Sequence, residues 1–265
     1  MSWATGTDDI LRNQMKNSEL KLKNPPIIEA ILDIECDLPP NLKIATLESR
    51  IKKALGKSYP KLRPIVFQQH QFEAKLNEPP KHSVTGDIQG LQFLHDNENQ
   101  VVQFRVQGFS FNRLEPYTSL DDYLPQIKKA WLAYVELASP LEVRLIRLRY
   151  INRILLDLVD GRVNLDKYFQ NGPKLADEEK QTFLGFLNQY SALDIETGFL
   201  VNSVLTAQMV EDDKLPIIFD NSAVIQENRS PDDWTWIHSK ILELRQLKNK
   251  VFTRTLTETC LNQYR

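Results

Sequence analysis

Apolar and polar residues alternate in the segment IIEAILDIE, which spans residues 27–35. Because successive side chains of a β-strand point to opposite faces, this pattern predicts a half-buried strand. One face of the strand is apolar and includes Ala30, Leu32 and Ile34. The other face is largely acidic: Glu29, Asp33 and Glu35. The strand is therefore expected to cover a core with one side and to present carboxylates on the other.

Four further segments carry apolar residues at helical spacing, with polar residues between them. Asn41 is expected to cap the first of these helices, and Ser119 the second, because both residue types suit an N-cap. The third helix is expected to begin at Asp177 and to carry an apolar stripe up to residue 190. Ser230, followed by Pro and two acidic residues, is expected to cap the fourth.

Runs rich in apolar, β-branched and aromatic residues, bounded by Asn, Pro and Gly clusters, predict additional strands. These runs occupy residues 65–76, 91–95, 101–111, 143–154, 199–210 and 217–226. The connections between several of them are short, which favours antiparallel pairing. We therefore expect an α+β fold, in which a mainly antiparallel sheet has its helices packed on one face.

Residues 1–23 are polar and poorly patterned, which predicts a flexible amino-terminal tail. The rest divides into two α+β halves, residues 24–158 and 159–265, which we expect to pack as one globular unit. In each half, strands lead through a capped turn into a Trp-containing helix, and an Asn-Arg pair precedes that helix. The pairs are Asn112-Arg113 and Asn228-Arg229. Two related βαβ-type halves are one interpretation of this similarity, and a coincidence of short motifs is the other.

The charge balance is nearly neutral, with 33 Lys+Arg and 35 Asp+Glu giving a formal net charge of -2. Such a chain has no overall attraction for nucleic acid or for an anionic membrane, so such binding needs a local basic patch. The amino-terminal residues lack the features of a signal peptide, and no run approaches the roughly 18 apolar residues of a membrane span. These observations predict a cytoplasmic protein with no membrane partner.

The sequence contains two cysteines, Cys36 and Cys260, without a Cys or His partner at metal-ligand spacing. Neither a zinc site nor a disulfide framework is expected, and both thiols are expected to be reduced. The sequence also lacks the glycine-rich phosphate loops and the nucleophile elbow of common enzyme families. We therefore expect no cofactor, and the sequence assigns no catalytic residue.

The segment VRLIRLRYINRI, residues 143–154, places Arg147, Arg149 and Arg153 on one face of a predicted strand. Arg105, on an earlier strand, is expected to extend this group, which we call the arginine stripe. A guanidinium group binds phosphate or carboxylate through two parallel hydrogen bonds, so the stripe suits an anionic ligand. The alternative is a lattice of ion pairs with carboxylates on neighbouring strands. Both interpretations stay open, because the register of the strands is not known from the sequence.

Three carboxylates also alternate on the first predicted strand: Asp33, Glu35 and Asp37. Such a set, projecting from one side of a strand, suits a hard divalent cation. Because strand alternation often produces such sets by chance, the sequence favours no metal site here. Asp33 and Glu35 are the candidate ligands if a metal binds.

Three stretches carry a family resemblance: NPPIIEAILDI, GFSFNRLEPYTSLDDY and RLRYINRI. Together with the carboxy-terminal helix and its VFTRTLTE extension, they resemble a sporadically distributed family of uncharacterised bacterial proteins. The resemblance covers most of the chain. It implies traffic on mobile elements, with roles in phage defence or toxin neutralisation, and it carries over no active-site residues.

Taken together, these features favour a non-enzymatic binding, regulatory or accessory module whose partner is another protein. The alternative is a phosphate-directed enzyme or nucleotide sensor that uses the arginine stripe. A third hypothesis is an RNA-binding module, in which Phe109, Phe111 and Tyr117 stack bases on an open sheet. The sequence leaves open whether the chain is an enzyme, and it does not give the oligomeric state.

Overall fold

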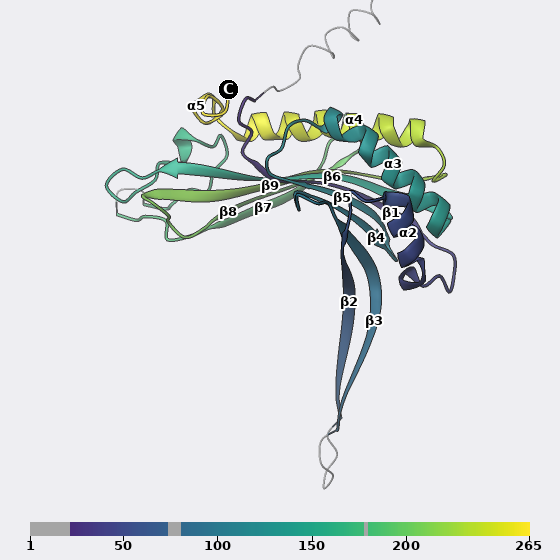
Figure 1. Cartoon of the computed structure of the whole chain (residues 1–265). Helices are drawn as coiled ribbons and strands as arrows, with labels where there is room; N and C mark the ends of the chain where they lie inside the picture. The colour runs from purple at the N-terminus through teal and green to yellow at the C-terminus, as the bar shows by residue number, and fades with distance from the viewer. Residues whose placement is uncertain (1–21, 74–80, 178–179) are drawn as a thin grey trace, which may run out of the picture.

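The structure is a computed structural model of the chain, and it describes residues 22–73, 81–177 and 180–265. Residues 1–21 of the expected tail lie outside the described residues. In the described part, nine strands form one sheet in the order β2-β3-β4-β5-β1-β6-β9-β8-β7, and neighbouring strands are antiparallel (Figure 1). The strands are β1 (Ile27–Asp37), β2 (Lys61–Glu73), β3 (Lys81–Leu94), β4 (Gln100–Arg105), β5 (Gly108–Leu114), β6 (Glu142–Asp157), β7 (Leu187–Leu193), β8 (Leu200–Ala207) and β9 (Lys214–Arg229).

The longer helices of the described chain all lie over one face of this sheet (Figure 1). The helical elements are η1 (Ile44–Leu47), α2 (Glu48–Leu55), α3 (Leu120–Ala138), η2 (Leu165–Lys167), α4 (Trp234–Thr255) and α5 (Glu258–Leu261), of which η1 and η2 are 3₁₀ helices. The expected α+β fold, with a mainly antiparallel sheet and helices on one face, is confirmed.

The main core lies between the sheet and the helices, where the alternation in β1 places its apolar side. Leu32 and Ile34 are buried there, beneath α3. From α3, Trp131 is fully buried, and its ring centroid lies 5.7 Å from that of Phe109 in an edge-to-face contact. The indole Nε1 of Trp131 donates a hydrogen bond of 3.1 Å to the carbonyl oxygen of Pro231, which precedes α4. This contact joins α3 to the segment that leads into α4.

The chain follows the same path twice through the sheet. β1 and β6 lie next to each other at its centre and pair directly. β5 pairs with β1 and leads into α3, and in the same way β9 pairs with β6 and leads into α4. A division by this path starts the second unit at β6, whereas the sequence-based division after residue 158 keeps β6 in the first half. One continuous sheet joins both parts, and their origin by duplication stays a prediction.

β3 pairs with β4 from Gly90 to Leu94, and beyond this pairing the β2–β3 hairpin extends away from the sheet, on the side opposite the helices (Figure 1). Its two strands are paired from Lys61 to Glu73. Val66 and Phe67 are neighbours in the sequence and therefore point to opposite faces of the hairpin. Both are exposed, by 49% and 60% respectively. Neither face of the hairpin is therefore covered at this point.

The predicted strand over residues 101–111 is wrong as a single element, because the chain reverses within it to form β4 and β5. The second strand begins at Gly108, which has a φ of 138°. A Cβ atom at this position would lie 2.1 Å from the carbonyl oxygen of Ile34 on β1, so only glycine fits. The predicted strand over residues 91–95 was too short, since β3 already begins at Lys81.

Two of the predicted helix starts are displaced. Asn41 does not cap a helix but lies in a turn with a φ of 71°, and the chain first becomes helical at Ile44. Left-handed backbone is a conformation that Asn tolerates well. Ser230 also precedes the actual N-cap, which is Asp233, whose Oδ1 accepts a hydrogen bond of 3.0 Å from the Trp236 backbone N–H.

The second predicted helix is confirmed, since the Ser119 side chain caps α3 by accepting from the Asp122 backbone N–H at 3.3 Å. The third predicted helix is wrong. The Asp177 carbonyl oxygen accepts a hydrogen bond of 2.9 Å from the Gln181 backbone N–H, but the described residues 180–190 contain no helix, and the end of the predicted helix is the edge strand β7. Tyr190 pairs with Ser203 of β8 in this strand. Tertiary pairing with β8 therefore overrides the local spacing of apolar residues.

Candidate functional site

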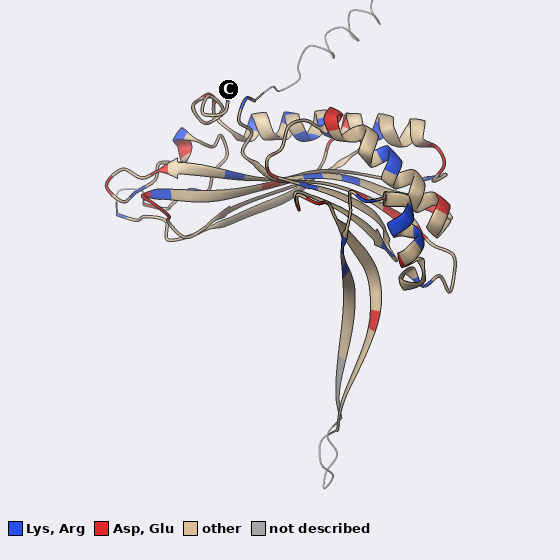
Figure 2. Cartoon of the chain, in the orientation of Figure 1, with Lys and Arg blue, Asp and Glu red and all other residues tan. Residues whose placement is uncertain are grey.

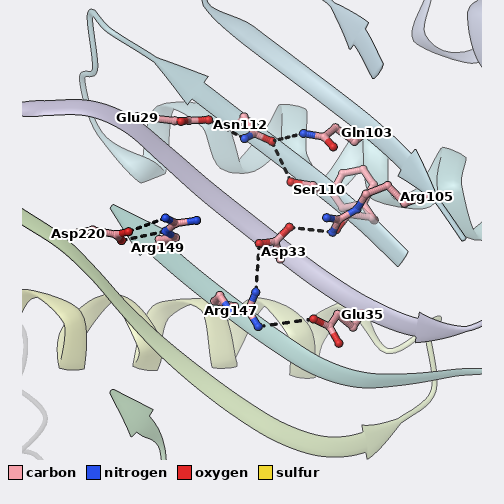
Figure 3. A network of polar contacts seen from close by, with 11 residues as sticks. Glu29, Asp33, Glu35, Gln103, Arg105, Ser110, Asn112, Arg147, Arg149 and Asp220 are labelled. Carbon is pink, nitrogen blue, oxygen red and sulfur yellow. Dashed lines mark hydrogen bonds and ion pairs between the residues drawn. The ribbon is translucent and has the colours of Figure 1, made fainter. Parts of the chain in front are cut away.

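The sheet face opposite α3 and α4 carries the charged residues that the sequence singles out. We call it the open face, because no described helix covers it (Figure 1). Figure 2 shows basic and acidic positions side by side along the central strands. The register places these polar residues on the open face: Glu29, Asp33, Glu35, Gln103, Arg105, Ser110, Asn112, Arg147, Arg149 and Asp220 (Figure 3).

The arginine stripe is assembled on this face. Arg147, Arg149 and Arg153 occupy alternate positions of β6, so that their side chains leave the sheet on the same side. Arg105, at the end of β4, joins them through Asp33 of β1. Its Nη2 lies 2.8 Å from Asp33 Oδ1, while Arg147 Nη1 lies 3.8 Å from Asp33 Oδ2 (Figure 3). The structure therefore brings the four candidate arginines onto one surface, with a carboxylate between two of them.

Asp33 is the most sheltered charged group of this cluster, with 12% of its side chain exposed, compared with 34% for Arg147. Arg147 also contacts a second carboxylate, since its Nη2 lies 3.6 Å from Glu35 Oε1. The partly buried Arg105 has one atom, Nε, that is buried and lacks a hydrogen-bond partner in the described structure. The cluster is thus a row of alternating charges across β4, β1 and β6.

The other two arginines of the stripe are paired with carboxylates from the second part of the chain. Arg149 binds Asp220 of β9 through two parallel bonds, with Nε 2.8 Å from Oδ1 and Nη2 2.5 Å from Oδ2 (Figure 3). The hydrogen bonds to Asp220 raise the pKa of the Arg149 guanidinium. Arg153 pairs with Glu211, which lies in the connection between β8 and β9.

Neutral polar side chains continue the network toward β4 and β5. Asn112 Nδ2 donates to Glu29 Oε1 at 2.7 Å, and Asn112 Oδ1 accepts from both Ser110 Oγ at 2.8 Å and Gln103 Nε2 at 3.2 Å (Figure 3). Ser110 and Asn112 are buried although no helix covers them. Their donors and acceptors are therefore satisfied by one another, as buried polar groups require.

This geometry agrees with the ion-pair lattice, one of the two interpretations of the arginine stripe. Each of the four arginines already has a carboxylate within ion-pair distance. A phosphate that approaches the stripe would have to displace one of these carboxylates and would meet the negative charge of the others. Because the pairs are partly exposed, each is worth roughly 0–1 kcal/mol. The open face is therefore a preorganised polar surface with its charges compensated.

The candidate metal ligands take part in the same lattice. Asp33 and Glu35 face guanidinium groups, and Asp37 pairs with Arg144, whose Nε lies 3.1 Å from its Oδ1. Among residues 22–73, 81–177 and 180–265, no group of three or more His, Cys, Asp or Glu side chains could hold a metal ion.

The aromatic residues considered for base stacking lie on the helix side of the sheet. Phe109 and Phe111 are buried in the core. Tyr117 follows β5 and hydrogen-bonds through its hydroxyl to that of Tyr150, at 2.8 Å. None of these three rings therefore forms a stacking platform on the open face.

Two functional positions were missed by the sequence analysis, namely the carboxylates Asp220 and Glu211 that pair with the stripe. Asp220 is the one charged residue in the segment IIFDNSAVI, and a single charge in a largely apolar strand signals a partner on a neighbouring strand. Its partner, Arg149, is 71 residues away in the sequence. The pairing itself therefore required the register of β6 against β9.

Both cysteines are buried and neither forms a disulfide. No helix of the described chain combines the length and the apolar character needed to cross a membrane. Comparisons with protein-family models, with curated proteins and with solved structures find no significant match to this chain, so the family resemblance of its motifs stays a prediction.

Proposed function

We propose that this chain is a non-enzymatic binding module that recognises another protein through its β2–β3 hairpin and its open face. The observation that carries the proposal is the hairpin, which is paired from Lys61 to Glu73 and projects from the sheet. An isolated two-stranded ribbon is at best marginally stable in water. A partner that covers the hairpin would supply burial that the chain itself does not provide.

The composition of the hairpin favours a protein partner over nucleic acid. Residues 64–72, PIVFQQHQF, contain no Asp, Glu, Lys or Arg, and Asp87 is the one such residue between Ser83 and Leu94. Val66, Phe67 and Val84 are exposed by 49%, 60% and 49%. Exposed apolar and aromatic groups of this kind are typical of protein interfaces, whereas contacts to a nucleic-acid backbone depend on Lys and Arg.

The open face supports the same function in a different way. Its charges are paired across strands, so a protein laid on it meets fixed donors and acceptors rather than a single sign of charge. Such patterns contribute more to specificity than to affinity. We extend the proposal to the role that the family resemblance implies, an accessory or antidote subunit in phage defence or toxin neutralisation. An antidote of this type acts by covering a surface of its target and needs no catalytic residue.

The proposal is tested by affinity purification of the tagged chain from its native cells, followed by quantitative mass spectrometry. The variants are Phe67→Asp, which places a charge on the hairpin, and Leu132→Asp, which places one on α3. Leu132 is 44% exposed and lies on the helix side of the molecule, so it is a matched control. We expect one protein to be enriched equally by the wild type and by Leu132→Asp, and to be lost with Phe67→Asp.

Two results would contradict the proposal. One is enrichment of the same protein by all three chains, which would locate the interface elsewhere. The other is the recovery of RNA or a nucleotide without a protein, with retention that depends on Arg147 and Arg149, which would favour the anion-directed alternatives. Circular dichroism of the three purified chains checks that each variant is folded.

A further inference from the structure

A pocket with a volume of about 430 Å³ lies on the helix side of the sheet. Its walls come from the start of α3, the second half of α4, β1 and β6, and they include Ile27, Tyr117, Ser119, Tyr150, Arg245 and Lys248. Pockets of about 300–1,000 Å³ are the usual size for small-molecule sites. The pocket is separate from the open face, and an inference about it goes beyond the proposed protein-binding function.

Lys248 is the unusual residue of this pocket. Only 6% of the residue is exposed, and its Nζ lies 3.5 Å from the centroid of the Tyr150 ring. In the described part of the chain, no carboxylate lies within ion-pair distance of this ammonium group. Burial, with a smaller contribution from the positive charge of Arg245, lowers the pKa of Lys248 to about 7. A buried ammonium is costly without a counter-ion, so the site favours an anion beside it.

Other groups around the pocket also offer hydrogen-bond donors. The N-terminal end of α3, a helix of 19 residues, contributes Ser119, Leu120 and Asp121 to the wall. The first N–H groups of a helix have no partner within the helix and attract anions. Arg245 Nη1 lies 2.8 Å from Asp121 Oδ2, so this carboxylate is compensated by a guanidinium group. Lys248 therefore adds a net positive charge to the pocket when it is protonated.

The two tyrosines of the pocket also act as donors. The hydroxyl groups of Tyr117 and Tyr150 are 2.8 Å apart, so one of them donates to the other and the second proton can be donated elsewhere. Burial raises the pKa of Tyr150 to about 12 and that of Tyr117 further, so both hydroxyls are protonated at neutral pH. Apolar side chains complete the walls, among them Ile27 and Phe252. The pocket thus combines donors with a small apolar surface.

We propose that this pocket binds a small organic anion, whose single phosphate or carboxylate group contacts the Lys248 ammonium and whose compact apolar part lies against Ile27 and Phe252. Two observations carry the assignment independently of each other, the buried ammonium, which in the described chain contacts the Tyr150 ring but no carboxylate, and the helix N-terminus that shares its pocket. The protonated Lys248 and the free N–H groups at the start of α3 favour a negative ligand. The volume of about 430 Å³ is sufficient for a molecule of the size of a substituted benzene ring.

The test uses benzoate and phenyl phosphate as probes, with benzyl alcohol as the uncharged control of similar size. Binding to the full-length chain is measured by isothermal titration calorimetry and by thermal shift. We expect both anions to bind and benzyl alcohol to leave the melting temperature unchanged. Lys248→Met is expected to weaken anion binding by about tenfold or more, since it removes a charge-assisted hydrogen bond.

Two controls separate this site from other basic groups. Lys250→Met changes an exposed lysine on the same helix that does not line the pocket, and it should leave binding unchanged. The double variant Arg147→Ala, Arg149→Ala removes charges from the open face and should also have no effect. Loss of binding in the double variant, with retention in Lys248→Met, would overturn the assignment.

The dependence on pH gives a further readout. Arg245, Asp121, Tyr117 and Tyr150 are the other charged or titratable groups around the pocket, and the raised pKa values of the two tyrosines keep their hydroxyls protonated near neutral pH. Benzoate keeps one negative charge between pH 6 and pH 8.5, so loss of the Lys248 proton is expected to weaken its binding by about tenfold over this range. Binding that does not change with pH would contradict the role of Lys248.

A crystal structure of the wild-type chain with phenyl phosphate tests the proposed anion site even if Lys248→Met does not fold. We expect the phosphate within hydrogen-bond distance of Lys248 Nζ. Density for the phosphate at another place, or no stabilisation by either anion at pH 6, would overturn the proposal.

Discussion

Arg149 on β6 and Asp220 on β9 form a two-point ion pair across the sheet, with nitrogen–oxygen distances of 2.8 and 2.5 Å. The pairing of the two strands fixes both backbones, so only side-chain rotamer freedom is lost when the ion pair forms. The Arg149 side chain is 41% exposed, however, and solvent screens the interaction. The pair therefore orders the open face more than it stabilises the fold.

A double-mutant cycle with Arg149→Ala and Asp220→Ala should accordingly give a coupling energy of about 0.5–1 kcal/mol. The measurement is the free energy of unfolding in urea for the wild type, the two single variants and the double variant. The coupling should fall when the salt concentration rises, because part of the pair faces solvent. A coupling energy of zero would mean that the two side chains do not meet in solution.

Gly108 is the position at which a small substitution should destabilise the sheet most. Gly108→Ala places a Cβ atom 2.1 Å from the Ile34 carbonyl oxygen, at a φ of 138° that other residues rarely adopt. We expect a loss of about 3 kcal/mol or more in the free energy of unfolding, measured in urea. Gly185→Ala is the matched control, since no atom lies within 4 Å of its Cβ position. A loss of similar size in both variants would contradict the close contact between β1 and β5.

The sequence was sufficient for the parts of the fold that depend on local pattern. The alternation of apolar and polar residues predicted that Asp33 and Arg147 each lie on the polar face of their strand. The Ser119 cap located the start of α3. The partners of the arginines could not be obtained in this way, because pairing between distant strands depends on their register. Asp220, for example, is brought to Arg149 only by the pairing of β9 with β6.

One error and one omission have physical causes of the same kind. The apolar residues of the segment that ends in β7 fit both a helix and a strand. Pairing with the free edge of β8 favours the strand. The burial of Lys248 could also not be predicted from the sequence. It lies beside the apolar stripe of α4, and its burial is set by Tyr150, which comes from β6 and is 98 residues earlier in the sequence. The local sequence pattern predicts the helix but not the residues that pack against it.

The buried lysine also makes a prediction about stability. An unfolded chain keeps the Lys248 proton up to a pKa of about 10.5, whereas the folded chain releases it near pH 7. Between these values the unfolded state binds more protons, so the free energy of unfolding rises with pH. Relative to Lys248→Met, the wild type should gain about 1 kcal/mol per pH unit between pH 7 and pH 9, in urea titrations. Parallel pH profiles for the two proteins would show that Lys248 keeps its proton in the folded state.

The thiols should be unreactive in the native protein. Burial raises the pKa of Cys36 and of Cys260 to about 12, so almost no thiolate is present at pH 8. We expect negligible reaction with Ellman's reagent over minutes in buffer, and rapid reaction of two thiols per chain in guanidinium chloride. Rapid labelling of one thiol in buffer would place that cysteine at an accessible surface.

The central claim is that the hairpin binds another protein, and site-specific photo-crosslinking in native cells tests it most directly. The photoreactive residue p-benzoylphenylalanine replaces Phe67 in one chain and Leu132 in another, since both positions are exposed. We expect a single protein adduct from position 67 after irradiation and none from position 132. The absence of a protein adduct at position 67, or the same adduct at both positions, would contradict the proposed interface.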